Sequence, residues 1–457
     1  MRKIGLAIWF LCSTVIVGSV SHAQVMIGAY VPGDAWDVRE IVAFNEASEK
    51  DLAFVTIFSA FSHDWENQLH WQSSNIYNNA AIPLITWMPV DTERKTTNLL
   101  PEIIAGDWDA YIDDWIAGLL TWVDSYASYK KPIVLLRFAH EFNGSWYPYS
   151  GEPSQYVAAW QHIHDRFAAT RANDYVEWVW SANHVNYDEH DDMTLYYPGE
   201  RYVDWTSLDG YNWGTNHDWT EWDSFQDLFA AAYHTLVTNY PNKPILIAEY
   251  GTAEPADLPS EDWMQYGNNS DRRENKAAWF YDTLAVIEQR YPAIRGLGLF
   301  NLDKELSWSV TGGDSTGLDG YNLGMASNHY TSRFLGARLM ILGAAIDDET
   351  LRRLEEEPVP VYDVVLDGSI NRELDRADSN TTVVKAYYAT DRLRTLTVRR
   401  DMIDLNEHQR LASENLPGEE TMQVATKTAK NYRERFKKRS RQQRGKMARG
   451  RMNILDY

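Results

Sequence analysis

Residues 133–141 read IVLLRFAHE, an apolar run interrupted by one arginine and followed by His140 and Glu141. A short run rich in leucine and β-branched residues is typical of a strand that is buried on both faces of a parallel sheet. Seven further runs of this kind lie at residues 25–30, 54–58, 82–88, 176–180, 205–211, 245–249 and 294–300. The sequence therefore predicts eight buried strands.

The segments between these runs have the residue spacing of amphipathic helices. Asp37 is placed to begin one of these helices and Ser154 another. Strands that alternate with helices over about 320 residues are expected to close into a (β/α)8 TIM barrel of the α/β class. An open doubly wound sheet is the alternative, but no glycine-rich phosphate turn follows the first run. We predict a barrel over residues 24–345 with a small C-terminal extension.

Two glutamates lie at predicted strand ends on opposite sides of the barrel. Glu141 follows the fourth run, Glu249 ends the seventh, and aromatic residues flank both. Active residues of (β/α)8 enzymes project from these strand ends. Hydrolysis of a glycoside needs one carboxylic acid to protonate the leaving oxygen and one carboxylate to attack the sugar, and a separation of about 5–5.5 Å gives retention. One such glutamate could merely cap a loop, but two favour a hydrolytic pair.

The motifs around both glutamates resemble those of glycoside hydrolase family 26. Residues 137–147, RFAHEFNGSWY, resemble the acid/base motif of that family, in which a histidine precedes the glutamate. Residues 247–251, IAEYG, resemble its nucleophile motif, and the resemblance as a whole covers roughly residues 25–340. It implies a retaining (β/α)8 enzyme that cuts β-1,4-mannans, mixed-linkage β-glucans or β-xylans. It also implies that Glu141 is the general acid/base and Glu249 the nucleophile.

Neighbouring side chains suit these two roles. An acid stays protonated near neutral pH only in apolar or like-charged surroundings, which Trp146 and the second carboxylate could supply. Tyr211, at the end of the sixth run, is the expected hydrogen-bond donor to ionised Glu249, and the family resemblance assigns this tyrosine the same task. His140 is expected to position the attacked sugar or to orient a glutamate. The substrate-binding residues predicted from the first motif are Arg137, His140, Asn143 and Trp146.

Tryptophan is the residue in excess. The chain has 19 tryptophans, and all except Trp9 lie between Trp36 and Trp308. Indole faces pack against the C–H faces of sugar rings, so a ring of tryptophans suits a polysaccharide cleft. Any single tryptophan could instead belong to the core. The tryptophans that follow predicted strands, and are expected around the mouth of the barrel beside Tyr211, are Trp87, Trp146, Trp213 and Trp308.

Residues 1–23 have the order of a secretory signal peptide. Arg2 and Lys3 precede an apolar stretch that ends in small residues at positions 21 and 23. A membrane anchor is the alternative reading of such a stretch. The one cysteine of the chain, Cys12, lies inside it, so the mature protein would contain no disulfide. We therefore expect a secreted protein, either extracellular or periplasmic.

The region after the barrel differs in composition, since it contains no tryptophan. A strand is predicted at residues 361–366 and a hairpin at residues 381–390 and 393–399. These elements predict a β-containing appendage over residues 346–425.

Residues 426–457 are expected to form a basic tail. Twelve basic residues lie between Lys427 and Arg451, although the net charge of the whole chain is −22. The tail is either a solvated, partly helical segment or a device for attachment to an anionic surface. The acidic body argues against nucleic acid as a partner.

Taken with the family resemblance, these features predict a secreted, endo-acting β-glycanase that works by retaining double displacement. Residues 209–214, DGYNWG, look more like the glucanase and xylanase branches of the family than the typical mannanase. Mixed-linkage β-glucan is therefore the first expected substrate and mannan the second. The alternatives are a β-1,4-mannanase, a β-1,3-xylanase or a non-catalytic glycan-binding barrel. We expect the protein to be a monomer. We also expect no cofactor and no metal, because two carboxylates and water suffice for the reaction.

Overall fold

The computed structural model describes residues 24–127, 131–187, 191–218, 220–255, 274–312, 316–332, 334, 381–388 and 392–399. The predicted signal peptide, the predicted strand at residues 361–366 and the basic tail lie outside these ranges.

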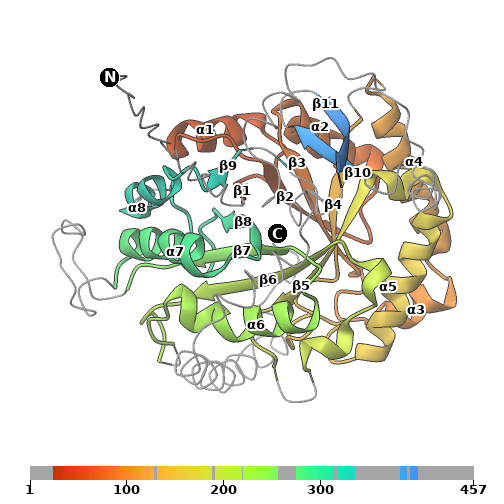
Figure 1. Cartoon of the computed structure of the whole chain (residues 1–457). Coiled ribbons are helices and arrows are strands. Elements are labelled where there is room, and N and C mark those ends of the chain that lie inside the picture. Colours follow the sequence, from red (N-terminus) through yellow and green to blue (C-terminus); the bar gives the residue numbers. More distant parts are fainter. Residues whose placement is uncertain are drawn as a thin grey trace, which may run out of the picture.

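A closed barrel of eight parallel strands forms the centre of the molecule (Figure 1). Each strand pairs with the next along the chain, and β1 pairs in parallel with both β2 and β8, which closes the ring. The predicted (β/α)8 fold is therefore confirmed. The strands are β1 (Val25–Tyr30), β2 (Phe54–Ala60), β3 (Ile82–Met88), β4 (Val134–Phe138), β5 (Val176–Asn183), β6 (Trp205–Asn212), β7 (Ile245–Thr252) and β8 (Ile294–Phe300), with a two-residue strand β9 (Tyr330–Thr331) added beside β1.

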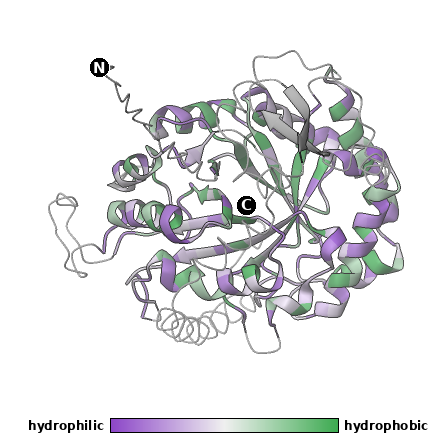
Figure 2. Ribbon diagram, in the orientation of Figure 1, coloured by the Kyte–Doolittle hydropathy of each residue, from purple (hydrophilic) through white to green (hydrophobic). Residues whose placement is uncertain are grey.

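Helices surround the barrel and carry both hydrophilic and hydrophobic residues (Figure 2). Asp37 caps the first of them as predicted, since its side chain accepts a hydrogen bond from the Arg39 amide at 3.0 Å. The fifth helix begins at Pro153 rather than at Ser154, because proline is well suited to the first turn. The helices are α1 (Val38–Ser48), α2 (His70–Asn78), α3 (Leu100–Ala105), α4 (Asp109–Asp124), α5 (Pro153–Ala168), α6 (Phe225–Asn239), α7 (Lys276–Arg290) and α8 (Thr316–Met325), with short turns η1 (Trp65–Leu69), η3 (Arg171–Tyr175), η4 (Met193–Tyr196) and η5 (Glu200–Tyr202).

A β-bulge in β7 lies next to the predicted nucleophile. The pairing of β7 shifts by one residue against β6 and again against β8, beside Ala248 and Glu249. A side chain at Gly298 would lie 2.4 Å from the Ala248 carbonyl oxygen, so only glycine lets the two backbones approach this closely. Because side chains alternate between the two faces of a strand, one extra residue re-aims those that follow it.

Trp87 lies in the core between β3 and α4, not at the mouth of the barrel. Its side chain is fully buried and stacks on Trp115 with ring centroids 4.8 Å apart. Its indole nitrogen donates to the Tyr111 hydroxyl at 3.2 Å. The prediction that Trp87 is a sugar platform is therefore wrong. Much of the tryptophan excess is likewise core, since Trp122, Trp160 and four others (Trp115, Trp178, Trp180 and Trp205) are also fully buried.

Replacing Trp87 by alanine is expected to lower the free energy of unfolding by about 4 kcal/mol, because a large buried ring would leave a cavity. Trp36 is 50% exposed, and its replacement by alanine should change the same quantity by about 0.5 kcal/mol or less. Urea denaturation followed by circular dichroism measures both values. If Trp87→Ala left the stability unchanged and raised KM, Trp87 would have to be assigned to sugar binding after all.

Two strands of the C-terminal region are described. β10 (Thr381–Tyr388) and β11 (Arg392–Arg399) pair antiparallel, with Thr381 opposite Arg399, and so form the predicted hairpin. Within the described ranges, no helix has the length and hydropathy needed to span a membrane.

Candidate active site

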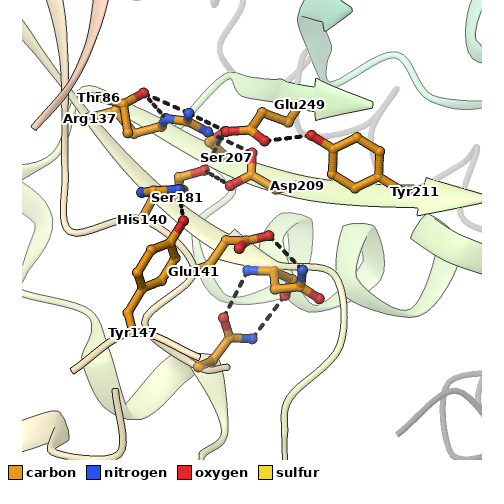
Figure 3. Close-up of polar contacts among 12 residues, drawn as sticks. Thr86, Arg137, His140, Glu141, Tyr147, Ser181, Ser207, Asp209, Tyr211 and Glu249 are labelled. Atoms are coloured by element: carbon orange, nitrogen blue, oxygen red, sulfur yellow. Dashed lines mark hydrogen bonds and ion pairs between the residues drawn. The ribbon is translucent and has the colours of Figure 1, made fainter. Parts of the chain in front are cut away.

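Arg137, inside β4, is the centre of the polar contacts within the barrel mouth (Figure 3). Its side chain is fully buried, and it donates from Nη1 to Asp209 Oδ1 at 2.9 Å and from Nη2 to Glu249 Oε1 at 2.5 Å. Its Nε donates to Thr86 Oγ1 at 2.9 Å. The prediction that Arg137 binds substrate is therefore wrong, because the guanidinium is enclosed by protein groups and holds Glu249 instead.

Glu249, on β7 beside the bulge, has both carboxylate oxygens engaged. Arg137 donates to one oxygen, and the Tyr211 hydroxyl donates to the other at 2.6 Å. The hydrogen bond expected of Tyr211 is thus present. Donors to both oxygens fix the plane of the carboxylate, which orients an oxygen for attack.

Glu141 lies just after β4 in a left-handed backbone conformation, with φ of 53°. Its amide donates to the Ser181 carbonyl oxygen at 2.9 Å, which ties this turn to β5. Its carboxyl accepts from the Trp146 indole at 2.6 Å and from Asn183 Nδ2 at 2.8 Å. Burial, followed by the charge of Glu249, raises the pKa of Glu141 to about 7, against the lowering effect of its two hydrogen bonds and of Arg137.

Asn143 acts on this carboxyl indirectly. Its side chain is fully buried, accepts from the Asn183 amide at 2.8 Å and donates to the Asn183 carbonyl oxygen at 2.9 Å. Asn143 therefore fixes Asn183, which in turn donates to Glu141. The prediction that Asn143 binds substrate is wrong, because its amide is used within the protein.

His140 is also buried, with 1% of its surface exposed. Its Nε2 lies 2.9 Å from the Tyr147 hydroxyl, and Tyr149 donates to its carbonyl oxygen at 3.0 Å. Burial, followed by the charge of Arg137, lowers the pKa of His140 well below its ordinary value, so the ring is neutral. Its Nδ1 has no hydrogen-bond partner among the described residues. The two tyrosines, rather than either glutamate, are the groups that His140 contacts through hydrogen bonds.

The remaining predicted tryptophans lie at the mouth to different degrees. Trp146 is half-buried and contacts Glu141 directly. Trp308 lies with its ring centroid 5.0 Å from Tyr211 and 5.0 Å from Trp213. Only 5% of Trp213 and 2% of Trp308 are exposed, so neither offers an open ring face on which a sugar could stack.

Asp209 is a site residue that the sequence motifs do not identify. It lies on β6, fully buried, and accepts from Arg137 and from the Ser181 hydroxyl, the latter at 3.1 Å. Burial raises the pKa of Asp209 well above its ordinary value, although Arg137 opposes the shift. The available signal is that Asp209 is the one charged residue of the predicted strand at residues 205–211. Among the residues that the structure describes, no group of three or more His, Cys, Asp or Glu side chains is arranged to hold a metal ion.

The barrel carries a carboxyl group with a raised pKa just after β4, and a carboxylate with both oxygens hydrogen-bonded on β7. Two carboxyl groups in such different environments are typical of the site of a glycoside hydrolase. The chain belongs to glycosyl hydrolase family 26, whose family model matches residues 68–289. This finding confirms the family predicted from the sequence.

The proteins to which the chain is similar are named for two different activities. Endoglucanase H of Acetivibrio thermocellus is 33% identical over 323 residues, which are 67% of this chain but only 32% of that protein. A mannan endo-1,4-β-mannosidase of Caldalkalibacillus mannanilyticus is 34% identical over 88 residues, 17% of this chain and 16% of that protein. The catalytic domain of an endo-β-1,4-mannanase of this family from Bacillus sp. JAMB-750 shares the fold, with a TM-score of 0.50 and 16% identity over 68% of this chain and 88% of that one.

Proposed function

We propose that the protein is a secreted, retaining endo-β-glycanase that hydrolyses internal bonds of mixed-linkage β-glucan. The observation that carries the reaction type is the contrast between the two carboxyl groups. The pKa of Glu141 is raised to about 7, whereas Glu249 accepts hydrogen bonds from Arg137 and Tyr211. Pairs of carboxyl groups in such different environments are typical of an acid and a nucleophile.

In this proposal Glu141 protonates the departing glycosidic oxygen while Glu249 attacks the anomeric carbon from the opposite face. The sugar–oxygen bond breaks as the bond to Glu249 forms, which gives a covalent glycosyl-enzyme. Glu141, now ionised, then removes a proton from water, and the oxygen of that water displaces Glu249. Two inversions give net retention, which proton NMR of the newly formed reducing end can detect.

The glucan assignment rests on similarity to Endoglucanase H and on the motif at residues 209–214. β-Mannan is the second candidate, because a shorter stretch is similar to a mannan endo-1,4-β-mannosidase. Reducing-sugar release from lichenan, mannan, β-1,3-xylan and carboxymethylcellulose distinguishes them, and we expect the highest rate on lichenan. Faster release from mannan or xylan would replace the substrate assignment. Release from none of them would favour the non-catalytic glycan-binding alternative.

The expected pH dependence follows from Glu141. Because this group must be protonated to act as the acid, kcat/KM on lichenan should fall as the pH rises through about 7. The raised pKa keeps the proton bound up to neutral pH, and above it the acid form is lost. An aryl glycoside whose leaving group needs no proton is the control and should lack this fall in kcat/KM. The same alkaline fall for both substrates would assign it to another group.

Secretion is proposed from the order of residues in the segment 1–23. Binding of the basic tail to an anionic surface and a monomeric state are likewise proposals. N-terminal sequencing of the exported protein tests the proposed secretion. We expect the mature protein to begin at Gln24.

A further inference from the structure

A buried lysine fastens the loop that carries Trp308. Lys276 is the first residue of α7, and only 1% of its surface is exposed. Its Nζ donates to the carbonyl oxygens of Ser307 at 2.7 Å and Ser309 at 2.5 Å. These two residues flank Trp308 on either side. The ammonium therefore ties the backbone of the β8 loop to the neighbouring helix, through hydrogen bonds strengthened by its charge.

The stem of this lysine is also fixed. A side chain at Gly317, in the first turn of α8, would lie 2.9 Å from Lys276 Cγ, so the two segments are closely packed. The Lys276 amide donates to Glu254 Oε2 at 3.0 Å, which links the start of α7 to the segment after β7. These contacts restrict the position of the Lys276 side chain and therefore the position of its ammonium group.

From Trp308 a short series of contacts reaches the nucleophile. The Trp308 ring lies 5.0 Å from Tyr211, and the Tyr211 hydroxyl donates to Glu249 at 2.6 Å. Asp303 and Asn301 hold the far side of the same loop, since they accept from the Ser309 and Val310 amides, each at 2.9 Å. Asn301 and Asp303 belong to the same loop after β8, so their hydrogen bonds are internal to that loop. Lys276, by contrast, belongs to α7 and joins the loop to another element.

We propose that Lys276 is a positioning residue for catalysis: by holding both peptides beside Trp308 it sets the position of that ring, and through Tyr211 the orientation of Glu249. This inference rests on the proposed role of Glu249 as nucleophile. Small displacements of an attacking group cost large factors in rate, so the effect should fall mainly on kcat.

Two other lysines of the chain provide matched controls. Lys50, just before β2, donates to the carbonyl oxygens of Met325, Ser327 and Tyr330 at 2.5, 3.2 and 2.9 Å. Lys243, just before β7, donates to those of Glu200 and Val203 at 2.9 and 2.6 Å. Both fasten loops at the opposite end of the barrel from the site, where strands begin. Their replacement removes the same type of interaction without touching Trp308.

The test compares Lys276→Met with Lys50→Met and Lys243→Met, in wild-type protein and in a Trp308→Ala background. Lys276→Met should lower kcat/KM on lichenan about tenfold, mostly in kcat, with partial recovery in Lys276→Arg. In the Trp308→Ala background it should lower kcat/KM less than about twofold, because both changes act through one ring. The two control variants should lower Tm but change kcat/KM less than about twofold. An equal effect of Lys276→Met in both backgrounds would overturn the proposal.

Hydrogen exchange separates this proposal from the function on which it rests. Amides of residues 303–312 should exchange faster in Lys276→Met than in wild type, and at the wild-type rate in the two control variants. Unchanged exchange there overturns the bracing role whatever the activity. Absence of hydrolysis by the wild type on all four polymers overturns the proposed function, while faster exchange would still assign Lys276 to holding the loop.

Discussion

Replacing Glu249 by alanine is expected to lower kcat on an activated aryl β-glycoside by at least about 10⁴-fold. The change removes the only proposed attacking oxygen, while its two donors, Arg137 and Tyr211, remain. Arg137 keeps its hydrogen bond to Asp209, so the buried guanidinium is not left without a carboxylate. We therefore expect a folded but inactive protein, which circular dichroism and the melting temperature can verify.

Azide is expected to restore turnover of this variant. A small anion fits the space that the carboxylate vacates, beside the cationic Arg137, and attacks the anomeric carbon as the aryl oxide leaves. The carbon–nitrogen bond forms on the face opposite the departing group, so a β-glycoside gives an α-glycosyl azide. Proton NMR of the product identifies it. Hydrolysis at the wild-type rate without azide, or a β-glycosyl azide as the product, would contradict the assignment of Glu249.

The barrel could be predicted because its signal is local. Parallel strands covered on both faces read as apolar runs, and β1, β3 and β8 match their runs residue for residue. Strands β5 and β7 extend three residues further than predicted, through Ser181-Ala182-Asn183 and Tyr250-Gly251-Thr252, where the apolar pattern stops. Two of these strand-end residues, Ser181 and Asn183, donate hydrogen bonds to the site carboxyls of Asp209 and Glu141, and the hydrophobic pattern gives no signal for them.

The two glutamates and Tyr211 could also be predicted, because strand ends of a barrel meet at one mouth. What the sequence could not reveal is which polar groups face one another beneath that mouth. Arg137 and Asn143 belong to the same motif as Glu141, yet their side chains point into the protein and hold other site residues. Asp209 is joined to Arg137 across 72 positions of the chain, a pairing set by strand register and not by any local pattern.

The second large effect is expected for Glu141→Ala. On lichenan, whose leaving group is a sugar alkoxide, loss of the acid should lower kcat/KM by about 10³-fold. On an aryl glycoside with a good leaving group the first step needs no proton, so kcat/KM should fall far less. The second step then becomes slow because no base activates water, and the glycosyl-enzyme should accumulate. Mass spectrometry of the quenched enzyme detects this adduct as an added glycosyl mass.

Azide makes the two glutamate variants opposite in outcome, which is why they are best tested together. In Glu141→Ala the nucleophile is still present, so azide attacks the glycosyl-enzyme after one inversion has taken place. The second inversion gives a β-glycosyl azide, whereas Glu249→Ala gives the α-anomer. Asn183 and Trp146 would lose their common acceptor in Glu141→Ala, and Glu141→Gln, which retains an oxygen for one of them, controls for that loss. If both variants yielded the same azide anomer, the division of roles between Glu141 and Glu249 would be wrong, even if each variant were inactive on polysaccharide.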